Sequence, residues 1–311
     1  MVSIFSKLIN ANGISEIKLY IINRIKYYRG DFLAFWGFKH NFPGKSIANA
    51  VQVRLSTQTG IPFEIEAFEL GWLKVSTPEI ALRTPKWLVR TPDIRLLILE
   101  NVEAPFTPIF ISGKAKILGQ LHGGTIEAST DLQSQKILDI SLAGVQIEQV
   151  PLIAAVPYAF VSGSLSLSAQ IENFNALQKQ KAQFPEGNLQ GKLNDSQIRI
   201  SGGTALLDLQ FPELTFSEVL FDLQLGPLIA IKKIQLKGSL EGTIEGTIQL
   251  DEKRPQMSLI DLNFELTPSP EFKKEISNFS TILRSFQCGE TIKINLKGTL
   301  NRLNFPTRNK C

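Results

Sequence analysis

The sequence predicts a mainly β protein built on an elongated, curved antiparallel sheet, a β-groove or flattened roll, with a few short helices. The strongest evidence is Ile234–Leu250, where apolar or glycine residues at even positions alternate with polar residues at odd positions. Because side chains of a strand point alternately to its two faces, this stretch has one apolar and one polar face. A single straight strand of this length would span roughly 55 Å, whereas about five or six residues are usual. Gly238, Gly242 and Gly246 lie on the apolar face, where a missing side chain lets a strand bend or another backbone approach.

The composition is that of a folded protein, with 43% apolar and 20% charged residues in 311. The 33 basic and 29 acidic side chains are too balanced for a nucleic-acid-binding surface, so we expect no nucleic-acid partner. Cys288 and Cys311 are the only cysteines. One disulfide between them is an alternative, but we expect two free thiols because a chain of this size can bury an adequate core without covalent crosslinks.

The N-terminal segment, residues 1–42, holds a local excess of basic side chains and precedes a predicted single β-rich domain at 43–306 and a tail at 307–311. Residues 13–28 have the spacing of a basic amphipathic helix, and an aromatic cluster follows it. The segment is therefore either a membrane-surface anchor or a helix packed on the sheet with its lysines in water. No window resembles a transmembrane helix or a secretory signal. The candidate membrane-contact residues are Ile14, Ile17, Ile21, Ile25, Phe32, Phe35 and Trp36.

The remaining elements follow in order from Pro43. Apolar residues at helical spacing predict a helix over Ser46–Ser56, which Gly60 would end. From Pro62 onward the apolar period falls to two, which is typical of strands, and Gly123-Gly124 predicts a turn. The predicted strands are 63–68, Trp72–Leu82, Thr91–Val102, Ile109–Leu121, Thr125–Thr130, Ile137–Ile147, Val161–Ile171, Gln197–Ser201, Val219–Leu225, Ile229–Leu250, Met257–Leu266 and Thr291–Leu300.

Three segments interrupt the strands. Pro151–Ala159 predicts a short apolar helix or turn, and the polar Asn173–Gln190 predicts a loop or frayed helix. A helix near residues 270–286 is predicted by a capping Ser269, a proline in its first turn and an apolar stripe. We expect this helix to cover the mouth or an edge of the sheet.

A short unit recurs along the chain. Ile234–Leu240 and Ile294–Leu300 agree at five of seven positions, and Val161–Leu165 and Ile111–Ala115 are looser copies. Recurrence of one strand unit predicts an elongated β array whose neighbouring strands bury each other's apolar faces.

The residue types that carry catalysis are sparse. His40 and His122 are the only histidines, and no cluster of His, Cys, Asp and Glu has metal-ligand spacing. The sequence contains no phosphate-binding loop, dinucleotide fingerprint or nucleophile elbow. We therefore expect no enzyme activity, no metal and no cofactor.

The order of motifs resembles the type II secretion system protein N family (general secretion pathway protein N) of Gram-negative envelopes. The resemblance rests on Phe42-Pro43 with the following helix to Leu55 and Gly60, on strands punctuated by Ser-Gly or Lys-Gly turns, and on Lys297–Leu300 followed by Phe305-Pro306. It covers roughly Asn41 to Pro306. The resemblance implies a short cytoplasmic end, one membrane helix, a β-rich periplasmic domain and no catalytic residues. It also implies kinship with AsmA-like proteins, whose apolar β-grooves handle lipids between membranes.

In this chain the charged, amphipathic residues 1–42 stand where that family has its membrane helix. We expect a non-enzymatic protein of the bacterial inner membrane, at its periplasmic face, that is a component or assembly factor of the type II secretion system. Its partners would be secretion-system or other envelope proteins and the membrane surface. The alternatives are an AsmA-like groove that binds phospholipid acyl chains and a purely structural or adhesive β protein. The candidate groove residues are Ile234, Leu236, Leu240, Ile244, Ile248, Ile292, Ile294 and Leu296.

Overall fold

The computed structural model describes residues 39–59, 61–84, 93–131, 137–151, 159–172, 186–200, 212–251, 257–279, 286–299 and 302–304. These residues form one long antiparallel open sheet with three α-helices, one of them N-terminal. The strand order is β1-β3-β4-β5-β6-β7-β8-β9-β10-β11-β12-β13-β15-β14, with β2 beside β3 and β16 beside β15. The predicted class, a mainly β antiparallel sheet with a few helices, is confirmed.

The chain divides into two compact units. The first contains the described residues within Met1–Ser141 together with Ile171 and Glu172. The second contains those within Leu142–Gln170 and Phe184–Cys311. The division runs through β7, and each unit is described below by itself.

The first unit has a core of fully buried apolar side chains. Its elements are α4 (Gly44–Thr59), β1 (Phe63–Ile65), β2 (Glu69–Leu70), β3 (Lys74–Arg83), β4 (Arg95–Pro105), α5 (Thr107–Ser112), β5 (Lys114–Leu121), β6 (Gly124–Asp131) and the start of β7 (Leu138–Gln146). Leu55 of α4 is fully buried, and Ile80, Leu99 and Leu121 of three successive strands are at most 2% exposed. This unit therefore buries its own apolar face.

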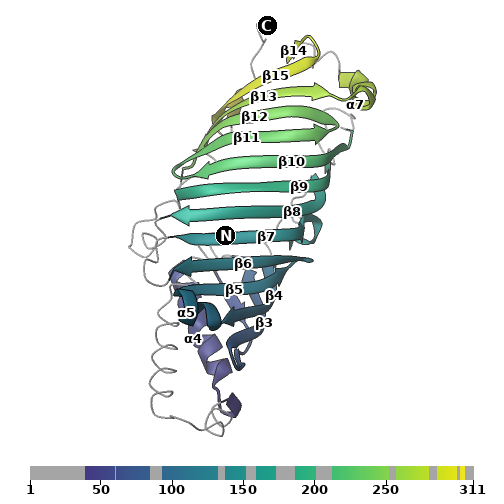
Figure 1. Ribbon diagram of the computed structural model, residues 1–311. Helices are drawn as coiled ribbons and strands as arrows, with labels where there is room; N and C mark the ends of the chain where they lie inside the picture. The colour runs from purple at the N-terminus through teal and green to yellow at the C-terminus, as the bar shows by residue number, and fades with distance from the viewer. Residues whose placement is uncertain are drawn as a thin grey trace. The chain divides into compact units, whose positions relative to one another are not determined.

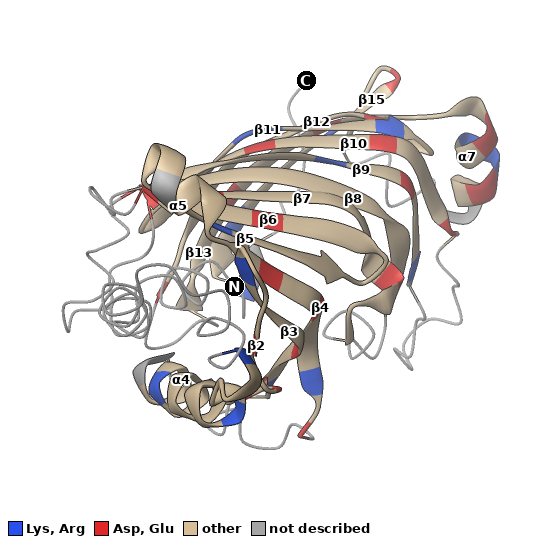
Figure 2. Ribbon diagram, turned by 60° about the horizontal axis from the view of Figure 1, so that its bottom comes forward, with Lys and Arg blue, Asp and Glu red and all other residues tan. Residues whose placement is uncertain are grey.

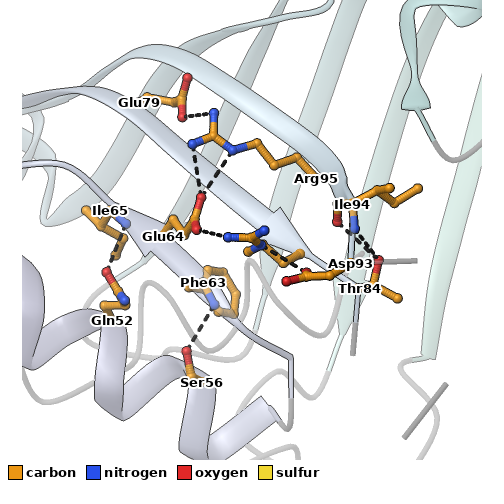
Figure 3. A network of polar contacts seen from close by, with 11 residues as sticks. Gln52, Ser56, Phe63, Glu64, Ile65, Glu79, Thr84, Asp93, Ile94 and Arg95 are labelled. Carbon is orange, nitrogen blue, oxygen red and sulfur yellow. Dashed lines mark hydrogen bonds and ion pairs between the residues drawn. The ribbon is translucent and has the colours of Figure 1, made fainter. Parts of the chain in front are cut away.

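Helix α4, which confirms the predicted helix, supplies hydrogen bonds to the edge strand β1. The Phe63 N–H donates to Ser56 Oγ at 3.0 Å, and the Ile65 N–H donates to Gln52 Oε1 at 3.1 Å (Figure 3). An unpaired strand edge is a template for association with another chain. The helix therefore satisfies donors that would otherwise invite strand addition.

A network of charges lies on the strands next to α4. Glu64 pairs with Arg83, and its Oε2 lies 3.1 Å from a terminal guanidinium nitrogen of Arg95; Figure 3 shows Glu64 with Arg95 and Glu79. Arg95 also pairs with Glu79 at 2.9 Å, and Arg83 with Asp93 at 3.0 Å. These pairs join β1, β3 and β4 across the face opposite to the buried core, as a solvated polar face requires.

One predicted strand of this unit is partly wrong. Ile109–Ser112 belongs to helix α5, and strand β5 begins only at Lys114. Pro108 fits the first helical turn, and Gly113 ends the helix with a left-handed φ of 68°. After β5 the predicted turn is present one residue earlier than Gly123-Gly124: His122 and Gly123, with φ of 45° and 78°, connect β5 to β6, and Gly124 already belongs to β6.

The second unit consists mainly of strands that follow one another in chain order. Its elements are the end of β7, a 3₁₀ turn η1 (Ile147–Gln149), β8 (Ala159–Glu172), β9 (Glu186–Ile200), β10 (Leu214–Leu225), β11 (Leu228–Gly238), β12 (Leu240–Gln249), β13 (Leu259–Pro268), α7 (Pro270–Glu275), η4 (Ile276–Phe279), β14 (Gln287–Cys288), β15 (Thr291–Thr299) and β16 (Arg302–Asn304). Figure 1 shows β9 to β13 side by side.

The stretch Ile234–Leu250 is not one strand but parts of two, β11 and β12, which pair antiparallel with Leu236 opposite Gly242. The chain reverses at Ser239, whose N–H donates to the Thr215 carbonyl of β10 at 2.7 Å. Gly238, immediately before it, has a φ of 153°. The glycine thus marks a reversal that alternation alone does not reveal.

Strand β9 begins eleven residues before the predicted Gln197, at Glu186. The prediction of a loop or frayed helix is therefore wrong for Glu186–Gln190, which belongs to β9. Its polar composition has a structural reason: Gly187 and Gly191 occupy positions opposite Leu225 and Phe221, so few large apolar residues mark the strand. The rest of that predicted loop lies outside the described residues, as does nearly all of Pro151–Ala159.

The C-terminal helix is confirmed but shorter than predicted. Ser269 caps α7, because its Oγ accepts the Phe272 N–H at 3.2 Å, and the helix continues after Glu275 as the 3₁₀ turn η4. Phe272 and Ile276 are buried. The prediction of free thiols is wrong for Cys288, which is disulfide-bonded. The other cysteine of the sequence, Cys311, lies outside the described residues.

Candidate functional site

The candidate site is one face of the second unit, built from β9 to β13 and β15. Residues directly opposite each other on paired strands share a face, so the strand registers define rows that cross the sheet. Four such rows contain only apolar residues and glycine. They are Leu193-Val219-Leu236-Gly242-Leu266-Ile292, Gly191-Phe221-Ile234-Ile244-Phe264-Ile294, Leu189-Leu223-Ile231-Gly246-Leu262-Leu296 and Ile229-Ile248-Ile260-Gly298. We call them together the apolar face.

The dimensions of the apolar face follow from sheet geometry. Six strands separated by about 4.8 Å give a width of about 24 Å. Four rows at every second residue extend about 20 Å along the strands. The face therefore has a footprint on the order of 480 Å², comparable to the largest apolar patch of a typical monomer, about 300–600 Å², which is often functional.

All eight candidate groove residues lie on this face. Seven belong to the four rows, and Leu240 extends the face beyond them, opposite Pro268. The structure thus brings together residues of β11 and β12 with residues of β15, some fifty positions later. The seven candidate membrane-contact residues, from Ile14 to Trp36, lie outside the described residues.

Side chains from other strands complete the face and were not predicted as site residues. Val219, Phe221 and Leu223 come from β10, and Leu262 and Phe264 from β13. Their alternation was visible in the sequence and predicted both strands. Alternation does not give the register between strands. The register decides which residues of β10 and β13 lie on the same face as Ile234.

A β-bulge keeps β11 in phase with its neighbours. The register of β11 against β12 shifts between Ile231 and Ile234, where Lys232 and Lys233 are both exposed. Without the extra residue, Ile229 and Ile231 would point to the opposite face from Ile234, because a one-residue slip reverses every side chain. The bulge therefore places four apolar residues of this strand on one face.

Burial distinguishes the apolar face from the core of the first unit. Most of its large side chains, such as Ile234, Ile244 and Phe264, are only half-buried, although Ile231 and Ile292 are 8% and 7% exposed. In the first unit, by contrast, Ile80, Leu99 and Leu121 are at most 2% exposed. The apolar face thus keeps part of its surface accessible.

Glycines on the face hold the strands in close approach. Gly242 and Gly246 have φ of 148° and 146°. A Cβ at these positions would lie 1.9 Å from the Glu265 carbonyl oxygen and 2.1 Å from that of Asp261. A Cβ at Gly191 would lie 2.5 Å from the ring of Phe221. A Cβ at Gly238 would lie 2.2 Å from the Thr215 carbonyl oxygen, so the predicted approach of another backbone is confirmed for Gly238, Gly242 and Gly246.

The recurring unit has the same role at each end of the site. Lys237-Gly238 and Lys297-Gly298 each place the lysine on the polar face and the glycine at positive φ, 153° and 142°. Gly163, in a looser copy, has a φ of 138°, whereas Gly113 caps a helix with a φ of 68°. Three of the four copies therefore share the same backbone conformation at their glycine, and the fourth ends a helix.

The opposite face is polar and held by ion pairs between neighbouring strands. Lys237 pairs with Glu218 at 2.5 Å, and Lys297 pairs with Asp261 at 2.9 Å. The lysine hydrogen bonds lower the pKa of Glu218 and of Asp261 below their ordinary values. The two faces of the sheet therefore differ sharply in polarity, as the alternation predicts.

Groups that carry chemistry are not gathered at this face. His122, in the β5–β6 turn, is half-buried; burial lowers its pKa, which the charge of Glu100 opposes. Among the described residues, no three His, Cys, Asp or Glu side chains are arranged to hold a metal ion. No helix in the described part of the chain is long and apolar enough to cross a membrane.

Comparison of the chain with protein-family models, with curated proteins and with solved structures finds no match.

Proposed function

We propose that this chain is a non-enzymatic protein of the bacterial envelope that binds lipid acyl chains on the apolar face. The observation that carries the proposal is the set of four rows, which present no polar side chain and whose large members are mostly only half-buried. An occupant of this face must be apolar along its whole length.

Acyl chains fit this surface better than a protein partner does. The hydrocarbon core of a bilayer is about 30 Å thick, so one leaflet's chains extend about 15 Å, within the roughly 20 by 24 Å of the face. A protein interface carries about one hydrogen bond per 100–200 Å². The apolar face offers no side-chain donor or acceptor, and backbone groups of its inner strands pair with their neighbours. Acyl chains bind without hydrogen-bond donors or acceptors.

The disulfide of Cys288 supports a location in the envelope. Disulfides persist in oxidising compartments such as the bacterial periplasm and are rare in the cytosol. This agrees with the periplasmic face of the inner membrane, which the resemblance to the protein N family implies.

The test is lipid extraction and mass spectrometry on the full chain purified without detergent. We expect lipid to copurify at a fixed stoichiometry. Ile234→Asp should abolish it, because a carboxylate would lie between Phe221 and Ile244 on the apolar face. Ile294→Asp, on β15, repeats the test on a different strand.

The matched control is Gln235→Asp, which adds the same charge one residue away on the polar face. It should retain wild-type lipid content. Circular dichroism must first show that all three variants are folded. Lipid-free wild-type protein, or lipid retained by folded Ile234→Asp and Ile294→Asp proteins, would exclude the proposal.

A second proposed function is a component or assembly factor of the type II secretion system. It is favoured by the residues that resemble the protein N family, namely Phe42-Pro43 ahead of α4 and Lys297-Gly298 in β15. Deletion of the gene should then reduce secretion of exported proteins. Unaltered secretion of every exported protein would count against this function and leave lipid binding as the better account.

A further inference from the structure

The two ends of the apolar face differ in how they present apolar side chains. At one end β13 leads into α7, and at the other end the turn between β10 and β11 leads into Leu228. At the α7 end, Phe272, Ile276 and Ile292 are 3%, 7% and 7% exposed. At the turn end, Leu228 and Leu259 are each 50% exposed. The turn end therefore presents large apolar side chains to solvent, whereas those at the α7 end are buried.

Leu228 and Leu259 share a row on the polar face of the sheet. Leu228 is opposite Gln249, Gln249 is opposite Leu259, and Leu259 is opposite Thr299. The two leucines are two strands apart, which is about 10 Å. A sheet face that only meets water would have polar side chains at both positions. Their exposure therefore points to contact with something apolar.

The apolar face continues around these strand ends. Ile229 and Ile260, in its fourth row, each follow one of the two leucines in sequence and point to the other side of the sheet. The Leu250 N–H donates to the Pro227 carbonyl at 3.3 Å, which brings the exposed Pro227 beside the half-buried Leu250. The sheet thus ends in a margin that is apolar on both sides, and we call it the Leu228 rim: Pro227, Leu228, Leu250 and Leu259. Residues 252–256, which connect β12 to β13 at this end and carry charges of both signs, lie outside the described residues and are not part of the rim.

The distribution of charge also distinguishes the two ends. The row that contains the two leucines has no charged residue from β11 to β15. By contrast, α7 has four exposed charged side chains of both signs, namely Glu271, Lys273, Lys274 and Glu275, and Figure 2 shows both colours on it. Lys273 also pairs with Glu290, just before β15, at 3.9 Å. Because a charge is costly to move from water into hydrocarbon, the α7 end is poorly suited to enter a bilayer.

We propose that the Leu228 rim contacts a phospholipid bilayer and is the end at which acyl chains enter and leave the apolar face, an inference that rests on the proposed lipid binding. Exposure of an acyl chain to water would slow its transfer by about fourfold for each CH₂ group exposed. A rim that is apolar on both sides lets a chain pass from the bilayer interior to the apolar face without this exposure.

A protein partner fits the rim less well than a bilayer does. A stable protein interface takes about 800 Å² and roughly 20–30 residues from each partner. The rim has four residues, and its row offers no charged side chain between β11 and β15 to orient a partner. A bilayer needs neither a large area nor a fixed orientation.

The test measures how fast lipid enters the full chain from vesicles. Phosphatidylcholine vesicles contain phosphatidylcholine with a pyrene-labelled acyl chain, whose excimer emission falls as the labelled lipid moves to the protein. The amount of lipid held at equilibrium is measured separately, by mass spectrometry on protein separated from the vesicles.

Leu228→Asp and Leu259→Asp should each slow uptake by about tenfold, because loss of a buried leucine side chain costs at least about this factor. Both should leave the equilibrium amount of lipid unchanged, because the two residues lie on the face opposite to the bound chains. Gln235→Asp is the matched control: it adds the same charge on the polar face, opposite Thr243 and away from the rim. It should take up lipid at the wild-type rate. Circular dichroism must show that all three variants are folded.

Two results would overturn the entry role of the rim while leaving lipid binding intact. The first is uptake at the wild-type rate by the folded Leu228→Asp and Leu259→Asp proteins. The second is an equal loss of rate and of equilibrium amount, which would make the rim part of the binding surface instead of its entrance. A wild-type chain that takes up no lipid and copurifies with none would exclude lipid binding by the apolar face, and the entry role with it.

Discussion

Gly242→Ala is expected to destabilise the second unit more than a glycine substitution normally does. The backbone at Gly242 has a φ of 148°, a conformation that side chains with a Cβ rarely adopt. A Cβ there would lie 1.9 Å from the Glu265 carbonyl oxygen and 3.0 Å from the Leu266 Cα. Both are backbone atoms of β13, so no side-chain rotation relieves the overlap. Strands β12 and β13 must separate locally.

The expected cost follows from two contributions. A residue forced into a sparsely populated backbone region costs about 1–3 kcal/mol. Loss of one hydrogen bond between the separated strands adds about 0.5–1.5 kcal/mol. The sum is about 3 kcal/mol. With a urea dependence of about 1–3 kcal/mol per molar, the unfolding midpoint should fall by about 1–3 M.

Urea unfolding followed by circular dichroism measures this shift, with Gly144→Ala as the control. Gly144 has a left-handed φ of 70°, but a Cβ there meets no atom within 4 Å. It should lose only about 1–2 kcal/mol, the cost of the left-handed conformation alone. Equal losses at Gly144 and Gly242 would refute the argument that contact with β13, rather than φ, dominates.

Three further predictions follow from single contacts. Burial lowers the pKa of His122 below its ordinary 6.5, so the unfolded chain binds a proton more readily and the free energy of unfolding should decline as the pH falls below 6.5. His122→Asn should make the urea midpoint depend less on pH in this range. An unchanged dependence of the midpoint on pH would contradict this role of His122. Lys297→Met should raise the pKa of Asp261 toward its ordinary 3.8 in an NMR titration, and no shift would show that Lys297 is not the cause. Substitution of both Gln52 and Ser56 by Ala should lower the free energy of unfolding by about 2–4 kcal/mol and promote association of the protein, because two N–H groups of β1 lose their acceptors. A variant that is monodisperse in sizing chromatography and has wild-type stability in urea would disprove this role of α4.

Both edges of the sheet are shielded by elements that alternation alone does not identify as covers. At one edge α4 supplies acceptors to β1. At the other, the short strands β14 and β16 pair with the two ends of β15. β14 pairs with Thr291 and Ile292 of β15, and β16 pairs with Lys297–Thr299. Short edge strands and lysine are two devices that discourage strand addition.

The errors of prediction have identifiable physical causes. In Ile109–Leu121 the alternation extends into a segment that belongs to α5, because a helix of six residues, Thr107–Ser112, has fewer than two turns and is too short to show a helical period. In β9 the reverse occurred, since glycine at Gly187 and Gly191 removed the apolar signal. The disulfide of Cys288 was missed because cysteine content alone does not decide pairing.

The sequence by itself determined the class of the fold and the polarity of its faces. Period-two alternation is a local property of each strand, and so all eight candidate groove residues could be assigned to an apolar face before any strand was paired. The caps at Ser269 and the turn at His122-Gly123 were equally local, because each rests on backbone preferences of a few neighbouring residues.

Only the tertiary structure decided how these strands combine into a site. Register brings Ile294 of β15 into one row with Ile234 and Phe221, and the bulge at Lys232-Lys233 keeps β11 in phase. The reversal at Ser239 depends on a carbonyl of β10, which is distant in sequence. Pairing is set by contacts between strands, and the accessibility of a face by what else packs on it. The residues of a single strand determine neither its pairing nor what packs on its face. Alternation therefore predicted an apolar face but not that most of its large side chains are only half-buried.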